Sequence, residues 1–170
     1  MDGQFVRSCC FIGNDSFVLG ANYDGTLGLY SFKENDIVRQ QSLVGDEMKS
    51  NIIFCVNNYR TKEKTYNFLS SHEDPVAKGW EMGDLFVLEP RKKYTGHCNS
   101  VRYVCTNLND TEVSTCCLDH SIRLWDEQKA TTKFILTGHN DNVVFADYVD
   151  NNTLVTASWD QTLRVYKIPK

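Results

Sequence analysis

The chain has 170 residues, of which 41% are hydrophobic and 24% charged, and its formal net charge at pH 7 is −4. This composition predicts a globular protein and excludes a disordered or collagen-like chain. The longest apolar run, residues 52–56, is far shorter than the roughly 20 residues that span a bilayer, so we expect no membrane span. The acidic balance argues against a broad polyanion-binding surface and leaves room only for a local basic patch.

Seven cysteines are present, an odd number, and they include two adjacent pairs and no Cys-x-x-Cys spacing. The first residues contain no basic segment that leads into an apolar run, so we expect no secretory signal. Buried, reduced thiols fit this pattern better than a disulfide framework does. The expected location is therefore cytoplasmic or nuclear.

Three segments repeat one order of features: an apolar run, an Asn/Asp turn, a second apolar run, an Asp-centred turn, and a third run that ends in an aromatic residue. They cover residues 5–30, 96–126 and 138–167. Asp119 and Asp160 are 41 residues apart, and His97 and His139 are 42 apart. Asp24 precedes Asp119 by 95 residues, which leaves room for a divergent second repeat. This period matches the roughly 40–45 residues of a four-stranded propeller blade.

Alternating apolar, β-branched and aromatic runs predict strands along the whole chain, and no window carries an apolar stripe at helical spacing. The expected fold class is therefore all-β. In chain order we expect blades over residues 4–43, 51–95, 101–136 and 143–168. The second blade is expected to use strands at 51–58, 65–71, 84–89 and 92–95, with an inserted loop between Ser71 and Asp84.

Two Gly-His pairs and the aromatic ends of their repeats resemble the WD-repeat β-propeller family. The residues are Gly96-His97 with Trp125-Asp126, and Gly138-His139 with Tyr166-Lys167. The resemblance is clear over 1–33 and 94–170 and weak over 34–93. It implies a propeller of four-stranded antiparallel blades over 1–170. Since most rings of this family have roughly six to eight blades, about four blades imply a partial or open propeller. Three alternatives remain: part of a longer propeller, a self-associating half-ring, or a four-bladed ring.

The resemblance also implies a buried hydrogen-bonded chain inside each blade, made by a His, a Ser or Thr, an Asp and a Trp. In the last repeat these places are taken by His139, Ser158, Asp160 and Tyr166. In the third repeat they are taken by His97, Asp119 and Trp125, with Cys117 where the hydroxyl is expected. The first repeat keeps only Asp24 and Tyr30, with Asn22 in the place of the hydroxyl and no Gly-His pair.

His139, Asp160 and Ser158 are also the residue types of a hydrolytic triad. A similar set recurs at the repeat period, whereas an active site occurs once, so we interpret the set as architecture and expect no enzyme. The histidines fit no metalloprotease spacing, and His97 beside Cys98 is a weak pair of ligand types. We therefore expect no metal and no cofactor.

The leading hypothesis is a non-catalytic scaffold that binds proteins or peptides, with no membrane and no small-molecule substrate. Trp80, with Met82 and Val76, is expected on the inserted loop as a partner anchor; the alternative is that Trp80 packs onto its own blade. A further expected partner is a chain or segment that completes the propeller.

The second hypothesis is a subunit of a ribonucleoprotein or nucleic-acid-associated complex. It would contact phosphates through Arg91, Lys92 and Lys93, with Lys62 and Lys64 in the preceding hairpin. The alternative for this cluster is a solvated strand edge, because lysine blunts an exposed strand.

Overall fold

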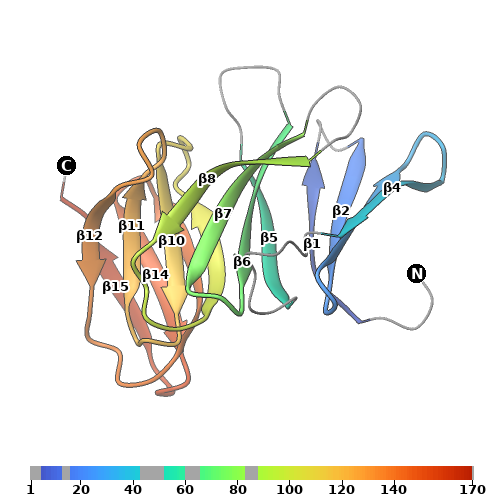
Figure 1. Ribbon diagram of the computed structural model, residues 1–170. Helices are drawn as coiled ribbons and strands as arrows, with labels where there is room; N and C mark the ends of the chain where they lie inside the picture. The colour runs from blue at the N-terminus through green and yellow to red at the C-terminus, as the bar shows by residue number, and fades with distance from the viewer. Residues whose placement is uncertain (1–4, 13–15, 43–51, 60–65, 83–87, 170) are drawn as a thin grey trace.

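The computed structural model describes residues 5–12, 16–42, 52–59, 66–82 and 88–169, and within these residues it contains β-strands and no helix (Figure 1). No helix in this part of the chain has the length and hydropathy required to cross a bilayer. The strands form four antiparallel sheets, three with four strands and the last with three. The all-β fold class predicted from the sequence is confirmed.

Each sheet is a meander in which strands that follow one another along the chain pair with one another. The first contains β1 (Val6–Ile12), β2 (Phe17–Asn22), β3 (Thr26–Ser31) and β4 (Asp36–Ser42). The second contains β5 (Ile53–Tyr59), β6 (Tyr66–His72), β7 (Val76–Met82) and β8 (Leu88–Thr95). The third contains β9 (Val101–Thr106), β10 (Glu112–Cys117), β11 (Ile122–Asp126) and β12 (Thr132–Leu136). The last contains β13 (Val143–Asp150), β14 (Thr153–Ser158) and β15 (Leu163–Lys167).

The second sheet differs from the sequence-based prediction. Its third strand is β7, over Val76–Met82, and not residues 84–89. The segment after Ser71 is thus a tight hairpin and not an inserted loop. The half-buried polar residues Lys78 and Glu81 interrupt the apolar run, and this conceals the strand in the sequence.

The turn between the second and third strands has the same construction in the first, third and last sheets. In each, an Asp carboxylate accepts hydrogen bonds from the backbone N–H and the hydroxyl of the residue two positions later, and the residue between them has a positive φ. These pairs are Asp24–Thr26, Asp119–Ser121 and Asp160–Thr162, with Gly25, His120 and Gln161 between them. The second sheet has Pro75 after Asp74, and a proline ring excludes positive φ, so this hairpin must turn differently.

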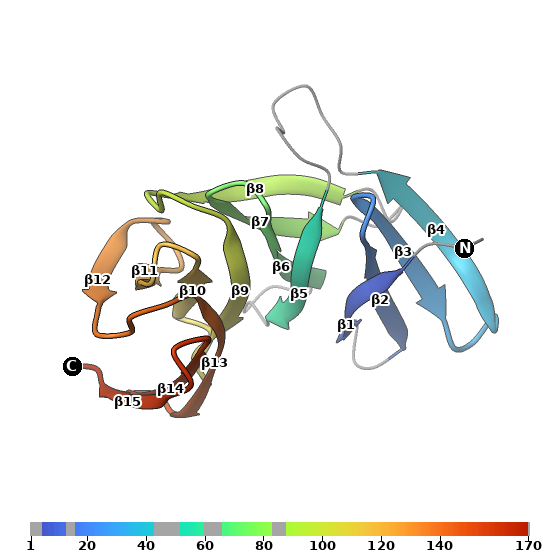
Figure 2. The same ribbon diagram turned by 90° about the horizontal axis from the view of Figure 1, so that it is seen from below.

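Successive sheets pack face to face in chain order along a curved path (Figure 2). β1 lies beside β5, β5 beside β9, and β9 beside β13, so these four strands form the inner side of the curve. Three clusters of buried apolar side chains fill the three spaces between neighbouring sheets. The first and last sheets do not meet, so the fold is a partial, open propeller, as the sequence predicted.

The last sheet has one apolar face that no other sheet of the described residues covers. Ile122 and Leu124 of β11 are fully buried where the last sheet packs on the third. The side chains at the same register positions of β15 are Leu163 and Val165, which are 74% and 64% exposed. The opposite end of the curve also exposes apolar rings, since Phe11 and Phe32 of the first sheet are about half exposed.

Candidate functional site: the hydrogen-bonded chains of the blades

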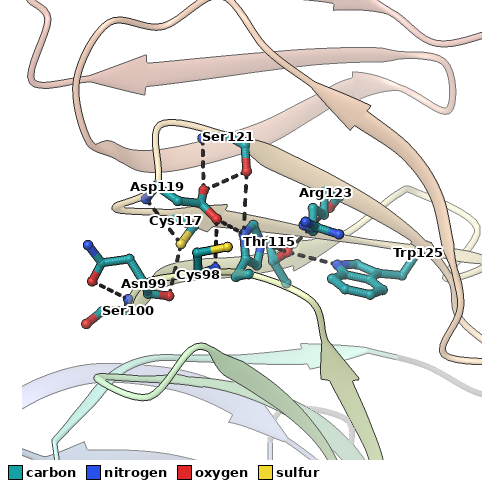
Figure 3. Close-up of polar contacts among 10 residues, drawn as sticks. Cys98, Asn99, Ser100, Thr115, Cys117, Asp119, Ser121, Arg123 and Trp125 are labelled. Atoms are coloured by element: carbon teal, nitrogen blue, oxygen red, sulfur yellow. Dashed lines mark hydrogen bonds and ion pairs between the residues drawn. The ribbon is translucent and has the colours of Figure 1, made fainter.

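The third sheet contains a continuous chain of four hydrogen-bonded side chains (Figure 3). Trp125 on β11 donates its indole N–H to Thr115 Oγ1 on β10 at 2.8 Å. Thr115 Oγ1 lies 2.7 Å from Nε2 of His97, which precedes β9. Nδ1 of His97 lies 2.9 Å from Oδ2 of Asp119 in the turn after β10. Three segments of one sheet are thereby tied together.

The chemistry of the end groups fixes the direction of this chain. An indole can only donate and an ionised carboxylate can only accept, so a neutral His97 accepts from Thr115 and donates Nδ1–H to Asp119. Burial lowers the pKa of His97, although Asp119 opposes this shift. Burial alone would raise the pKa of Asp119, but hydrogen bonds from Ser121, His97 and the Cys98 N–H hold it well below its usual value. The chain therefore joins a neutral imidazole to an ionised carboxylate.

The glycine before each histidine leaves room for an arginine. Gly96 has φ of 146°, and a Cβ there would lie 2.8 Å from Arg123 Nη1. The Arg123 guanidinium lies over the Trp125 ring, 5.9 Å from its centroid. Gly138 repeats the arrangement with φ of 128° and a Cβ position 3.1 Å from an Arg164 nitrogen. The Gly-His pair is thus a requirement of packing within the sheet.

The last sheet has a similar chain with a different hydroxyl from the one predicted. His139 Nδ1 lies 2.8 Å from Asp160 Oδ2, and its Nε2 lies 2.8 Å from Thr156 Oγ1. Ser158 instead donates to the carbonyl of Asp141 at 3.0 Å. Tyr166 does not replace the tryptophan in this chain, since its hydroxyl donates to the carbonyl of Thr137 at 3.3 Å.

The hydroxyls that bind the histidines, those of Thr115 and Thr156, thus lie four residues before the Asp. The sequence-based prediction placed them two residues before it. Both positions face the same side of the strand, so alternation alone does not distinguish them. In both sheets the His ring reaches past the residue at the strand end to the hydroxyl two positions earlier. Cys117 and Ser158, predicted to act here, instead hydrogen-bond to backbone carbonyls near the strand ends.

These contacts do not form the hydrolytic triad considered from the sequence. A nucleophilic hydroxyl must lie within hydrogen-bond reach of its base. His139 is bonded to Thr156, a hydroxyl that is fully buried. The geometry therefore supports the structural interpretation of His139 and Asp160.

His97, Cys117 and Asp119 place three ligand atoms within 4.8 Å of one another. Both His97 nitrogens already have protein partners, and burial raises the pKa of the Cys117 thiol to about 12. A metal ligand must be a thiolate or a free imidazole lone pair. This group is chemically suited to its hydrogen bonds and not to an ion.

The second sheet also contains a series of hydrogen-bonded side chains, which was not predicted from the sequence. Trp80 donates its indole N–H to Ser70 Oγ at 2.7 Å, and Ser70 Oγ lies 2.7 Å from Nε2 of His72. The His comes from the end of β6 and not from a Gly-His pair. Burial lowers the pKa of His72 to about 3, helped by the positive charge of Lys78. The signal in the sequence was Asp74, which stands 45 residues before Asp119 and aligns Ser70 with Thr115 and Trp80 with Trp125.

The expectation that Trp80 anchors a partner is wrong. Trp80 is 4% exposed, and its ring stacks on Phe68 with centroids 6.0 Å apart. Met82 is 2% exposed and lies in the same apolar cluster between the first and second sheets. Val76 begins β7 and pairs with Thr95. Val76 is half-buried, whereas Trp80 and Met82 belong to the core because β7 is an interior strand of its sheet.

The basic cluster on β8 is largely neutralised. Arg91 forms an ion pair with Glu81 at 2.6 Å. Lys92 pairs with the Glu127 carboxylate and also donates to the Glu127 carbonyl at 2.7 Å. Lys93 is exposed. Lys62 and Lys64 lie outside the described residues.

The first sheet contains no chain of this kind in its described residues. Gly20 stands at the register position of Thr115, so the bridging hydroxyl is missing. Asn22 donates to the hydroxyl of Thr26 at 2.7 Å. Tyr30 donates to Asn35 Oδ1 at 2.5 Å, on the exposed side of the sheet.

A family model described as "WD domain, G-beta repeat" matches residues 88–126 and 130–167. The chain contains two WD repeats. The resemblance predicted from the sequence is confirmed. Each WD repeat starts with the outer strand of one sheet and ends in the third strand of the next, because residues 88–126 hold β8–β11 and residues 130–167 hold β12–β15. Each WD repeat therefore joins two neighbouring blades.

Curated relatives are similar over most of the chain at low identity. Two are named "Ribosome biogenesis protein WDR12 homolog": that of Drosophila mojavensis is 24% identical over 89% of this chain and 39% of its own length, and that of Aedes aegypti is 23% identical over 91% and 40%. "Protein tipD" of Dictyostelium discoideum is 28% identical over 57% of this chain and 15% of its own length. The chain thus spans about two fifths of the length of the WDR12 relatives.

Two solved structures share the fold. "Structure of U3-55K" has a TM-score of 0.84 at 20% identity and covers 99% of this chain and 50% of that one. The computationally designed Ika4 protein has a TM-score of 0.76 at 18% identity, covering 99% of this chain and 94% of that one. At these identities the likeness concerns the fold alone.

Proposed function

We propose that this WD-repeat segment is a non-catalytic scaffold that binds protein partners through its uncovered sheet faces. The observation that carries the proposal is the exposure of Leu163 and Val165 at positions where Ile122 and Leu124 are buried by a following sheet. An exposed apolar face of this kind favours association. The partner that fits it is a further propeller segment, which would pack on the last sheet as that sheet packs on the third.

The names of the relatives support a role in ribosome biogenesis, and a nuclear location fits this role. The ribonucleoprotein alternative stated for Arg91, Lys92 and Lys93 has weaker support, because two of the three cations already have carboxylate partners. We therefore assign contact with other proteins, through the uncovered sheet faces, as the principal role of this segment.

The test is sedimentation of the tagged chain in nuclear extract. We expect it to travel in large particles, and we expect the double variant Leu163→Lys with Val165→Lys to shift to the free fractions. Leu108→Lys is the matched control, because Leu108 is 64% exposed in a turn away from this face. Equal sedimentation of all three proteins would refute the proposal.

A further inference from the structure

A cavity of about 330 Å³ lies where the inner strands of the four sheets approach one another. Its lining includes Arg7 of β1, Phe54 of β5, Arg102 and Tyr103 of β9, and Trp159 of the β14–β15 turn. Every sheet contributes to this lining. The cavity is therefore a feature of the assembled curve and not of one blade.

Two guanidinium groups face this cavity without carboxylate partners. Within the described residues, neither Arg7 nor Arg102 forms an ion pair. Burial lowers the pKa of Arg102, and the nearby charge of Arg7 lowers it further, while Glu73 opposes the shift. Two like charges held together are relieved by an anion between them. The site is thus a local cationic spot on a chain whose net charge is −4.

Aromatic rings alternate with these cations. Arg102 lies over the Phe54 ring at 4.1 Å from its centroid and over the Trp159 ring at 5.8 Å. Arg7 lies over the rings of Phe54 and Tyr23, at 5.3 and 5.7 Å. Trp159, which lines the cavity, and Tyr23, which contacts Arg7, are 54% and 47% exposed, so each presents ring surface to solvent.

We propose that this cavity binds single-stranded nucleic acid, with phosphates on Arg7 and Arg102 and a base stacked on Trp159. Guanidinium groups bind phosphate oxygens, and exposed aromatic rings stack on bases of any sequence. An acidic peptide would use the two cations but would leave the exposed rings without a role. The cavity is also concave and bounded by four sheets, which excludes a rigid duplex and admits an unpaired nucleotide. This site is separate from the uncovered apolar face of the last sheet, which contains Leu163 and Val165.

The test measures binding of a fluorescein-labelled oligouridylate of about ten nucleotides to the purified chain by fluorescence anisotropy. We expect Trp159→Ala to weaken binding about tenfold through lost stacking, with an unchanged salt dependence. Arg102→Ala should weaken binding and reduce the slope of log K against log salt by about 0.7, the value for one phosphate contact with a single strand. Arg102→Lys should keep the salt slope of the unmodified chain, because lysine retains the positive charge. Thermal unfolding of each variant checks that the fold is intact.

Arg39→Ala is the matched control, since Arg39 is exposed on β4 and does not line the cavity, and it should bind like the unmodified chain. The proposal is overturned if the unmodified chain does not bind oligouridylate, or if Trp159→Ala and Arg102→Ala bind it as well as the control. A polyglutamate peptide that displaces the RNA and binds Trp159→Ala with undiminished affinity would assign the cavity to acidic protein segments instead.

Discussion

At the scale of single residues, a buried hydroxyl determines how each blade is fastened. Thr115 accepts from Trp125 and donates to His97, so one side chain satisfies two otherwise unpaired buried groups. The resemblance to WD repeats predicted the His and the Asp of these chains but placed the hydroxyl at the wrong position. Thr115 and Cys117 share one face of β10, and only the reach of the imidazole ring decides between them.

His72 makes the stability of the protein dependent on pH. Its pKa falls from 6.5 to about 3 on folding, because burial disfavours the charged ring. The unfolded chain therefore binds a proton below pH 6.5 that the folded chain rejects until about pH 3. The stabilisation is complete above the unfolded pKa and is lost as the pH falls through this window, by about 1.4 kcal/mol per pH unit.

The measurement is urea unfolding at pH 7 and pH 5. We expect His72→Gln to remove about 2 kcal/mol of the stability lost between these two pH values, because the full slope applies only below the unfolded pKa of 6.5. The remaining loss should come from His97, whose pKa shifts the same way. His120→Asn is the control, because His120 is exposed and has φ of 66°, which Asn tolerates. An identical slope in His72→Gln and the unmodified chain would contradict this account.

At the scale of the strand, β7 shows where a repeat period is more informative than an apolar pattern. Lys78 and Glu81 break the run of apolar residues, so the pattern alone favours a loop with Trp80 on it. Lys78 lies over the Trp80 ring as Arg123 lies over Trp125, at 5.9 Å in both sheets. The spacing of Trp80 from Asp74 therefore contained the answer, whereas hydropathy did not.

Trp80→Ala should destabilise the protein by about 3–5 kcal/mol, since it opens a cavity beside Phe68 and leaves Ser70 without its indole donor. Chemical unfolding measures the loss. Trp159→Ala provides the comparison, because Trp159 is 54% exposed and its removal should cost far less. Equal losses in the two variants would show that Trp80 is not part of the core.

At the scale of the molecule, the two ends of the curve differ from every internal contact between sheets. Internal spaces are filled by clusters such as Ile122 and Leu124 against Val143 and Ala146. The repeat period could predict the number of sheets, and the resemblance to WD-repeat propellers, whose rings are larger, could predict the open curve. It could not predict the cavity near the inner strands, because that cavity depends on how four separate sheets are placed.

The isolated chain should self-associate through its uncovered apolar face. Analytical ultracentrifugation should show a mass that rises with concentration, and Leu163→Lys with Val165→Lys should remove most of this dependence by placing charges on the face. Leu108→Lys should behave like the unmodified chain. If the unmodified chain stays monomeric at all concentrations, the prediction is contradicted.

The hydrogen-bonded side chains of the second sheet also bear on the order in which the blades form. His72 and Trp80 lie two and ten residues from Ser70, whereas His97 lies 18 residues from Thr115. Closing a shorter loop costs less entropy, so the β6–β7 hairpin can assemble its contacts before the strand that follows each Gly-His pair has docked. This divergent hairpin is therefore suited to act as a folding nucleus, and its amide protons should be among the first to resist exchange during refolding.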